Sequence, residues 1–339
     1  MSELHKRRNP VFFQISLIIF GLLGSLNSSA QDPIFNQPYA TPMYTNPAFT
    51  GTTNFNTGGR ASLNYRNQWP SLPGSFHTTA FSYDQHVKEL GGGLGLLLTQ
   101  DVAGKGLLTT STIVLNYSYL LKVYKQIRIR LGLGLGIRQR SLDPSLLRFE
   151  DQIDATRGFV KPTSEPIGDF LFTTNSLSTG FLIYDKSWHL GFGIDNLNEP
   201  NESFYGDPSA YQPLRMTALA GKEITLSSWE REKSSVSFNS LYIQQAKFSQ
   251  LNIGSYLTTG WLVTGLWYKR VFSQDFDDTH QTTAILGWRR NKIRAAYSYD
   301  LTFLAGGNTY ASHEVSVVWQ WERKNIVREK TDLLSYPEF

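Results

Sequence analysis

The chain has 339 residues, of which 18% are charged, below the roughly 25% of an average soluble protein. Aromatic residues make up 14% and favour strands, and the hydrophobic share of 40% is too high for a disordered chain. The absence of cysteine excludes disulfides, thiolate metal sites and cysteine nucleophiles. Part of the net charge of +4 lies at the amino end, so the remaining excess does not indicate nucleic-acid binding.

Residues 1–30 have the pattern of a cleavable secretory signal peptide. Three basic residues at 6–8 precede a mostly apolar run at 11–26, and small residues follow at 28–30. A membrane anchor is the alternative, but the apolar run is shorter than the roughly 20 residues needed to span a bilayer. We therefore expect cleavage after Ala30 and a mature chain outside the cytoplasm.

Residues 31–58 show little alternation and contain four prolines. Because proline fixes φ and lacks a backbone donor, a regular strand is not expected there. We predict an ordered arm that enters the lumen of a barrel or lies beneath it. The prolines are Pro33, Pro38, Pro42 and Pro47.

From residue 59 to 323, apolar and polar residues alternate with a period of two. Between Ile127 and Ile137 the apolar residues occupy one parity, while glycine and arginine occupy the other. In a strand these two sets face opposite sides. About fourteen segments have this pattern, with roughly the 9–11 residues that cross a membrane. They lie at 59–68, 75–86, 91–101, 107–121, 126–140, 176–184, 188–196, 214–225, 234–244, 248–256, 260–270, 280–289, 292–300 and 312–323.

The connections between these segments also differ in length. Turns after even-numbered strands are short, whereas the long connections, 141–175, 197–213, 271–279 and 301–311, all follow odd-numbered strands. Outer-membrane barrels have short periplasmic turns and long outer loops. We therefore predict an all-β fold, a transmembrane outer-membrane β-barrel of about 14 antiparallel strands. Residues 324–339 would form a periplasmic tail, and a soluble β-sandwich is the alternative.

Aromatic and glycine residues in the predicted strands have expected places in such a barrel. Aromatic residues near strand ends would form interfacial girdles. Glycines in the strands would face inward and leave lumen space for a loop or plug. The aromatic residues are Trp69, Tyr83, Trp188, Trp261, Trp267, Trp288, Trp319 and Trp321, and the glycines are Gly91, Gly92, Gly93, Gly95, Gly132, Gly134 and Gly136.

The titratable residues do not predict catalysis. The sequence has no G-x-S-x-G nucleophile motif, and no grouping of the five histidines after residue 30 resembles a triad. We expect His189 to point into the lumen as an ordinary polar residue. Acidic residues such as Asp143, Glu150, Asp151 and Asp154 could hold calcium, but their spacing misses the EF-hand pattern and solvated carboxylates are favoured. We therefore expect no enzyme activity, cofactor or metal.

The segment Arg66-Asn67-Gln68-Trp69-Pro70 ends the first predicted strand. It could contact a partner at the rim, with Trp69 as an anchor. The favoured interpretation is architectural: Trp69 lies in a girdle, Pro70 ends the strand, and Arg66 pairs with an acid in the lumen. Four arginines of another strand could make the lumen basic, although ion pairing along the wall is the commoner arrangement. They are Arg128, Arg130, Arg138 and Arg140.

Several motifs together resemble the PorP/SprF family of type IX secretion membrane proteins. They are Gln31 to Gln37 (QDPIFNQ), Asn46-Pro47-Ala48-Phe49-Thr50-Gly51, Tyr65 to Pro70 (YRNQWP), Phe149-Glu150-Asp151-Gln152-Ile153-Asp154, Asn196 to Pro200 (NLNEP), Ser312-His313-Glu314 and the terminal Tyr336-Pro337-Glu338-Phe339. A cysteine often found in the family before that last proline is Tyr336 here. The interaction candidates taken from these motifs are Asn46, Pro47, Gly51, Arg66, Asn67, Gln68, Trp69, Pro70, Asp151, Gln152 and Asp154.

The resemblance implies a non-enzymatic outer-membrane barrel of Bacteroidota that works with the type IX secretion and gliding machinery. It implies that such a barrel helps to export, or holds at the cell surface, a large adhesin with a type B C-terminal sorting domain. Its partners would be outer-membrane lipid, the adhesin and periplasmic components of the machinery, with no nucleic acid. A passive or substrate-specific diffusion porin and, more remotely, a barrel hydrolase are the alternatives.

Overall fold

The computed structural model of the chain describes residues 31–53, 57–124, 126–154, 156–164, 170–203, 210–227, 234–273, 279–304 and 309–322. The predicted signal peptide at 1–30 and the predicted tail at 324–339 lie outside these residues. Asp275, Asp277 and Asp278, a second group of loop acids to which the same reasoning about calcium applies, also lie outside them.

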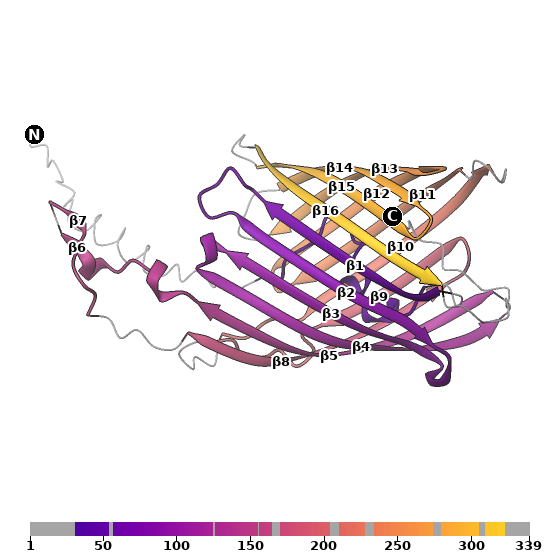
Figure 1. The fold of residues 1–339 in the computed structure, drawn as a ribbon, viewed down its shortest axis with the longest axis horizontal. Helices are drawn as coiled ribbons and strands as arrows, with labels where there is room; N and C mark the ends of the chain where they lie inside the picture. The colour runs from indigo at the N-terminus through magenta and orange to yellow at the C-terminus, as the bar shows by residue number, and fades with distance from the viewer. Residues whose placement is uncertain are drawn as a thin grey trace, which may run out of the picture. The chain divides into compact units, whose positions relative to one another are not determined.

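Fourteen strands pair in an antiparallel order and close into a barrel (Figure 1). Going round the wall, β1 is followed by β16 to β8 in descending order and then by β5, β4, β3 and β2. The strands are β1 (Thr57–Gln68), β2 (Phe76–Val87), β3 (Gly92–Ala103), β4 (Leu108–Tyr124), β5 (Ile127–Leu142), β8 (Leu171–Tyr184), β9 (Trp188–Asp195), β10 (Arg215–Ser227), β11 (Ser234–Gln245), β12 (Phe248–Thr259), β13 (Leu262–Ser273), β14 (Thr279–Arg290), β15 (Ile293–Phe303) and β16 (Thr309–Glu322).

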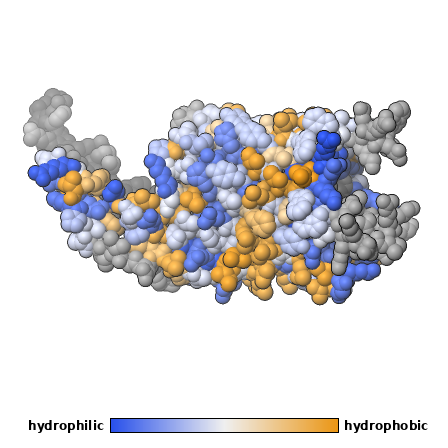
Figure 2. Space-filling view, in the orientation of Figure 1, coloured by the Kyte–Doolittle hydropathy of each residue, from blue (hydrophilic) through white to orange (hydrophobic). Residues whose placement is uncertain are grey.

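The strands form where the sequence alternates, and the alternation separates an apolar exterior from a mixed interior. On β5, Leu133 and Leu135 are 55% and 66% exposed on the outside, whereas Arg130 on the inside is 1% exposed. Exposed apolar side chains continue over the neighbouring strands and form the hydrophobic areas of the outer surface (Figure 2). No helix within the described residues is long and apolar enough to cross a bilayer.

The first and last strands complete the wall. β1 and β16 pair from Gly59 with Trp321 to Gln68 with Ser312. Because this pairing uses the backbone groups of both edges, neither strand is left with an open edge, which a lipid environment would penalise by several kcal/mol for each unpaired group. The first residue of β1, Thr57, pairs with the last residue of β16, Glu322. Both lie at the end of the barrel that carries the short turns.

The connections divide between the two ends as predicted. The short-turn end carries connections such as 88–91, 185–187 and 291–292, whereas the long-loop end carries 143–170 and 196–214. The long-loop end also carries a small hairpin of β6 (Ile153–Asp154) and β7 (Gly158–Phe159). Short 3-10 turns complete the connections: η2 (Lys88–Leu90), η3 (Gly104–Gly106), η4 (Pro144–Leu146) and η5 (Glu150–Gln152).

The fourteen predicted strands are confirmed, and four details differ. β8 begins at Leu171, five residues before the predicted start, because Thr173 to Asn175 are polar and hide the alternation. Gly91 lies in a turn with a left-handed φ of 61° and not in a strand, and Gly92 stands across from the outward-facing Tyr119 and so does not face inward as predicted. The placement of Trp267 in a girdle was wrong, since this side chain points inward and is 2% exposed.

Residues 32–53 run through the inside of the barrel and are almost wholly buried. They contain a four-residue helix, α2 (Pro42–Thr45), and a 3-10 turn, η1 (Pro47–Phe49), in which prolines occupy first-turn positions that need no backbone donor. We call residues 32–53 the lumenal arm. It packs an apolar core against inward-facing residues of the wall. The members of this core are Tyr39, Ala40, Ala48, Phe49, Leu182, Tyr184, Leu219, Leu241, Ile243, Tyr256, Val263, Trp267, Ile285 and Ala296.

Glycines on the wall leave space for the lumenal arm. A Cβ atom on Gly132 of β5 would overlap the backbone of Ala48, and one on Gly93 of β3 would overlap the backbone of Thr50. By contrast, a Cβ on Gly136, on the same strand as Gly132, would meet no arm atom and would lie 3.1 Å from a Val114 methyl group.

We predict that Gly132→Ala displaces the lumenal arm, since backbone atoms cannot move aside as a side-chain tip can. Overpacking of this kind costs about 1–3 kcal/mol. The thermal unfolding midpoint in detergent should fall by several degrees, and protease should cut the arm faster. Gly136→Ala is the matched control and should change neither measurement by as much. Equal effects of the two substitutions would contradict the contact with the arm.

Candidate functional site

The lumenal arm is held by buried polar contacts, and Glu314 of β16 makes the most central ones. Its carboxylate is fully buried and accepts hydrogen bonds from the backbone N–H groups of Asn36 (2.6 Å) and Gln37 (3.1 Å). Gln37 in turn donates to Ser298 Oγ at 3.2 Å and accepts from Ser316 Oγ at 2.5 Å. A carboxylate can be buried at this depth because its lone pairs are satisfied by donors.

A buried lysine on β13, three strands along the wall from β16, fixes the same part of the arm. Lys269 of β13 donates to the side-chain oxygen of Asn36 and forms an ion pair with Asp300 of β15 at 3.3 Å. Thr283 Oγ1 also donates to Asp300, at 2.5 Å. The arm is therefore tied to β13, β15 and β16 by charged groups that are shielded from water.

Asn46, Pro47 and Gly51, three of the predicted interaction candidates, lie in the middle and last parts of the lumenal arm. The Asn46 side-chain amide donates to the backbone carbonyls of Phe181 (3.1 Å) and Phe192 (3.0 Å). Its oxygen accepts from Ala48 N at 2.8 Å and so caps η1, with Pro47 at the first position. Asn46, with Pro47 beside it, thus holds the arm against β8 and β9.

Gly51, near the end of the lumenal arm, has a backbone φ of 67°, a left-handed conformation that favours glycine. Its N–H donates to Asp84 Oδ2 at 2.7 Å, and Asp84 is also bound by Arg60 at 2.8 and 2.9 Å. Arg130 of β5 donates to the carbonyls of Thr50 (2.9 Å) and Gly51 (2.8 Å). Arg130 is thus used to bind backbone carbonyls and does not line a basic channel.

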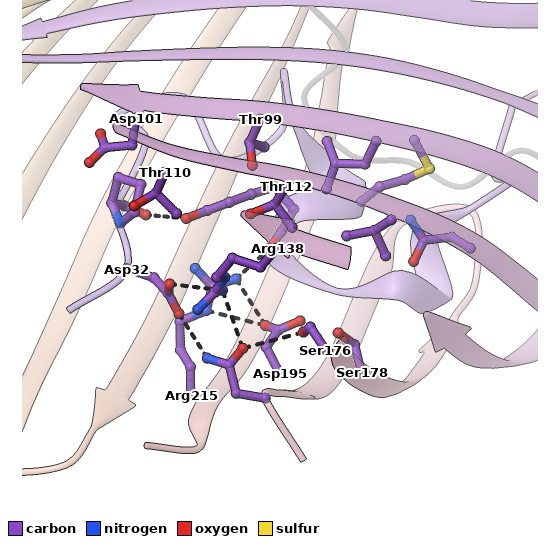
Figure 3. Close-up of a pocket in the computed structure, with 17 residues that line it drawn as sticks. Asp32, Thr99, Asp101, Thr110, Thr112, Arg138, Ser176, Ser178, Asp195 and Arg215 are labelled. Carbon is purple, nitrogen blue, oxygen red and sulfur yellow. Dashed lines mark hydrogen bonds and ion pairs between the residues drawn. The ribbon is translucent and has the colours of Figure 1, made fainter. Parts of the chain in front are cut away.

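At the long-loop end, the start of the lumenal arm joins a buried ionic cluster (Figure 3). Asp32 forms an ion pair with Arg138 at 3.1 Å, and Glu202 pairs with Arg138 at 3.0 Å and with Arg140 at 2.6 Å. Arg138 therefore bridges the arm and the loop that connects β9 to β10. Arg215 pairs with Asp195 at 2.9 Å beside them. We call these six charged residues the mouth cluster.

The space left beside the mouth cluster is small. A cavity of about 60 Å³ lies between the lumenal arm and β3, β4, β5 and β8. A water molecule needs about 10–15 Å³ of such space, so the cavity has room for several waters. Its walls carry hydroxyl groups of Thr99, Thr110, Thr112, Ser176 and Ser178 (Figure 3).

The predicted rim segment divides between the two faces of the wall. Arg66 is buried inside and lies across from Glu314 in the strand register, whereas Asn67 faces outward between His77 and His313. Gln68 is the last residue of β1. Trp69 leaves the strand with a φ of 55°, and its ring contacts Phe76 and Tyr310. Pro70 follows in the turn.

Asp151, Gln152 and Asp154 lie in the loop between β5 and β8, away from the lumenal arm in the chain. The Ser164 backbone N–H donates to Asp151 at 2.6 Å and lowers the pKa of that carboxyl, aided by the hydroxyl groups of Ser164 and Thr163. Asp154 likewise accepts from the Thr156 backbone and hydroxyl groups, which lowers its pKa. Gln152 Oε1 accepts from Phe149 N at 3.0 Å. These contacts shape the loop, and no group of three or more metal-binding side chains occurs among the described residues.

The family is decided by a match over most of the sequence. The model of a family described as type IX secretion system membrane protein PorP/SprF matches residues 27–319. The chain belongs to the PorP/SprF family. A closed barrel with an apolar exterior agrees with this membership, and the protein is an outer-membrane component of the type IX secretion system.

Solved barrels resemble this PorP/SprF chain only distantly. A FadL homologue of Pseudomonas aeruginosa shares 10% identity at a TM-score of 0.42, covering 78% of this chain and 90% of its own. The CymD monoaromatic hydrocarbon channel shares 9% at 0.43, covering 88% and 95%, and CdiB from Acinetobacter baumannii shares 6% at 0.44, covering 78% and 60%. No curated protein matches the sequence. These similarities are too distant to transfer a function.

The PorP/SprF chain also uses residues that were not among the predicted candidates. Glu314, Asp32 and Asn36 lie within the motifs that carry the resemblance, but their contacts with distant strands could not be read from them. Glu202 is close to one of these motifs and Lys269 lies outside them. Glu314 and Lys269 could have been found from the sequence, because each is a charged residue at an inward-facing position of a predicted strand.

We predict that Glu202→Gln releases the loop between β9 and β10 from the wall of the PorP/SprF barrel. Without the carboxylate, Arg138 and Arg140 lose a buried counter-ion, a change on the order of 3 kcal/mol. Hydrogen exchange at residues 196–203 should accelerate markedly. Glu199→Gln, at an exposed position of the same loop, is the control and should leave exchange unchanged. Unchanged exchange in the Glu202 variant would argue against the mouth cluster as a latch.

Proposed function

We propose that the protein is a non-enzymatic, closed scaffold of the type IX secretion and gliding machinery. It supports the export or surface anchoring of a large adhesin that carries a type B C-terminal sorting domain. Its outer loops would bind the adhesin, and its periplasmic side would bind periplasmic components of the machinery. The observation that carries the proposal is the lumenal arm, which fills the barrel and is tied to the wall along its length.

The packing of the lumenal arm against the wall argues against the alternative function, a diffusion porin. A porin needs a continuous aqueous path lined by polar side chains. Here apolar inward-facing residues of several strands join Tyr39 and Phe49 of the arm in one packed core. Moving the arm out of the lumen would expose this apolar surface. It would also leave the buried charges of Glu314 and Lys269 without their hydrogen-bond partners on the arm.

The surroundings of the inward histidine support a role without catalysis. His189 is 1% exposed and lies against Tyr39, whose hydroxyl is 3.2 Å from its Nε2 atom, and against the Phe49 ring. A general base must be within reach of a substrate proton. The lumenal arm separates this imidazole from solvent, which leaves no route by which a substrate could approach it.

The long loop between β5 and β8 is the proposed contact for the adhesin. Outer-membrane barrels have their long loops on the cell exterior. This loop exposes apolar side chains on its turns and on the β6–β7 hairpin, a composition that marks interaction surfaces. They are Leu146, Ile153, Phe159 and Val160. Asp151 and Asp154, through the hydrogen bonds described above, would keep the loop in one shape for binding.

The first test is permeability. We expect liposomes that contain the purified mature protein to swell no faster in small sugars than empty liposomes, because the lumenal arm blocks the path. A chain that lacks residues 32–53, shown to be inserted by its heat-modifiable electrophoretic mobility, should admit the sugars. Rapid swelling with the intact protein would favour the porin.

The second test is cargo display. In cells that lack the protein, a reporter fused to a type B sorting domain should disappear from the surface, and the intact gene should restore it. A variant with Ile153→Ser, Phe159→Ser and Val160→Ser should restore less, whereas Leu257→Ser, at an exposed site on the wall, serves as the control. Full display in the absence of the protein would contradict the proposed function.

A further inference from the structure

The outer face of the barrel carries the same tyrosine–histidine pair three times. In each pair a tyrosine hydroxyl lies within hydrogen-bond distance of a histidine Nδ1 atom on the next strand along the chain. The distances are 2.9 Å for Tyr65 and His77, 2.5 Å for Tyr268 and His280, and 2.7 Å for Tyr297 and His313. The three hairpins concerned are β1–β2, β13–β14 and β15–β16.

These hairpins form one continuous arc of the wall, from β13 through β16 and β1 to β2. Each histidine lies in the half of its strand nearer the long-loop end. Among the described strand residues, every outward-facing histidine lies on this arc. We call the three pairs the tyrosine–histidine belt. Toward the short-turn end, the same faces become apolar through residues such as Leu63, Leu286 and Val317.

The surroundings of the belt add donors and lack acids. Arg270 lies directly across from His280 on the outer face of β13, and Asn67 lies directly between His77 and His313. Among the described outward-facing strand positions in the long-loop half of the barrel, none is aspartate or glutamate. A belt of this composition, at the edge of the apolar surface, matches an anionic group in the membrane interface.

We propose that the tyrosine–histidine belt binds the phosphate groups of an outer-leaflet glycolipid. Because long loops face the exterior in such barrels, the belt lies at the level of outer-leaflet head groups. The acyl chains of the same lipid would lie on the apolar faces of the strands below.

The pairing fixes which nitrogen of the imidazole can donate to a lipid phosphate. When the tyrosine hydroxyl donates to Nδ1, the imidazole proton is on Nε2, which becomes a donor with a fixed direction. In the Tyr65–His77 pair this Nε2 atom also lies 3.1 Å from Ser75 Oγ, so a phosphate there would share the donor with that hydroxyl. A hydrogen bond from such a donor to a charged phosphate oxygen is stronger than one between neutral groups. The tyrosine is thus a positioning residue, and the histidine and Arg270 supply the contacts.

The proposal goes beyond the role in secretion and does not rest on it. A barrel that displays no adhesin could still hold this lipid, and a barrel without the lipid could still be plugged. Lipid binding and cargo display are measured separately, so failure of one is distinguishable from failure of the other.

The experiment measures lipid retention by the full mature protein with native mass spectrometry from mixed micelles. The probes are lipid A with its phosphates, the same lipid after removal of its phosphates, and phosphatidylglycerol. We expect at least tenfold tighter binding of phosphorylated lipid A than of either other lipid, the size expected from one or two hydrogen bonds to a charged group.

Two triple variants separate phosphate binding from an ordinary aromatic girdle. The first, His77→Phe, His280→Phe and His313→Phe, keeps the rings and removes the nitrogen donors, and it should lose the preference for phosphorylated lipid A. The second, Tyr65→Phe, Tyr268→Phe and Tyr297→Phe, removes only the hydroxyl groups and should weaken the preference by several fold. Tyr242→Phe is the matched control, since this exposed hydroxyl donates to Gln244 and contacts no histidine.

The outcomes decide the proposal. Unchanged selectivity in the histidine variant would show that the belt is only an aromatic girdle and would overturn it. Equal retention of phosphate-free lipid A or of phosphatidylglycerol by the unaltered protein would overturn it as well. Heat-modifiable mobility shows that each variant is folded, and if the phenylalanine variant fails this check, leucine at the same three histidines also removes the nitrogen donors and provides the comparison.

Discussion

A lipid environment offers no hydrogen-bond partner to the backbone, and the rest of this structure depends on that constraint. Each strand of the wall must pair on both sides, so the first strand has to meet the last. The β1–β16 pairing meets this requirement from Gly59 to Gln68. It also brings the start of β1 to the short-turn end, where Gly51 and the neighbouring residues of the lumenal arm contact the wall.

The lumenal arm gives the barrel a core that a hollow barrel lacks. The apolar wall residues that pack against the arm come from β8 and from β10 to β15, where they stand among polar ones such as Lys269, whereas the inward-facing residues of β1 to β5 are mostly polar or charged. The charged groups bind the arm through its backbone, as Arg130 does with the carbonyls of Thr50 and Gly51. Contacts with the backbone explain how so irregular a segment can be buried, since each of its polar groups needs a partner.

The sequence allowed the wall to be predicted but not the contents of the lumen. Alternation places a residue on one side of a strand, so the strands around Leu133 and Leu135 could be located to within a few residues. It does not say what that side faces. Trp267 was taken for a girdle residue because an inward tryptophan and a lipid-facing one look alike in the sequence, and only the buried arm distinguishes them.

The candidate site was predictable in part, for a related reason. Asn46 and Gly51 were singled out through the resemblance, and an acid partner in the lumen was expected for Arg66. The pairing of Glu314 with Asn36 and Gln37 joins residues 278 and 277 positions apart, and no local pattern encodes such a contact. The same holds for the ion pairs of Asp32 and Glu202 with Arg138.

The buried arm has a consequence for the order of assembly. Residues 32–53 precede β1 in the chain, yet their aromatic side chains lie deep inside the wall and belong to its apolar core. Tyr39 and Phe49 pack against inward-facing residues of that wall. Closing the seam between the two terminal strands around this segment would bury both at once, so that insertion into the membrane and filling of the interior would become one event.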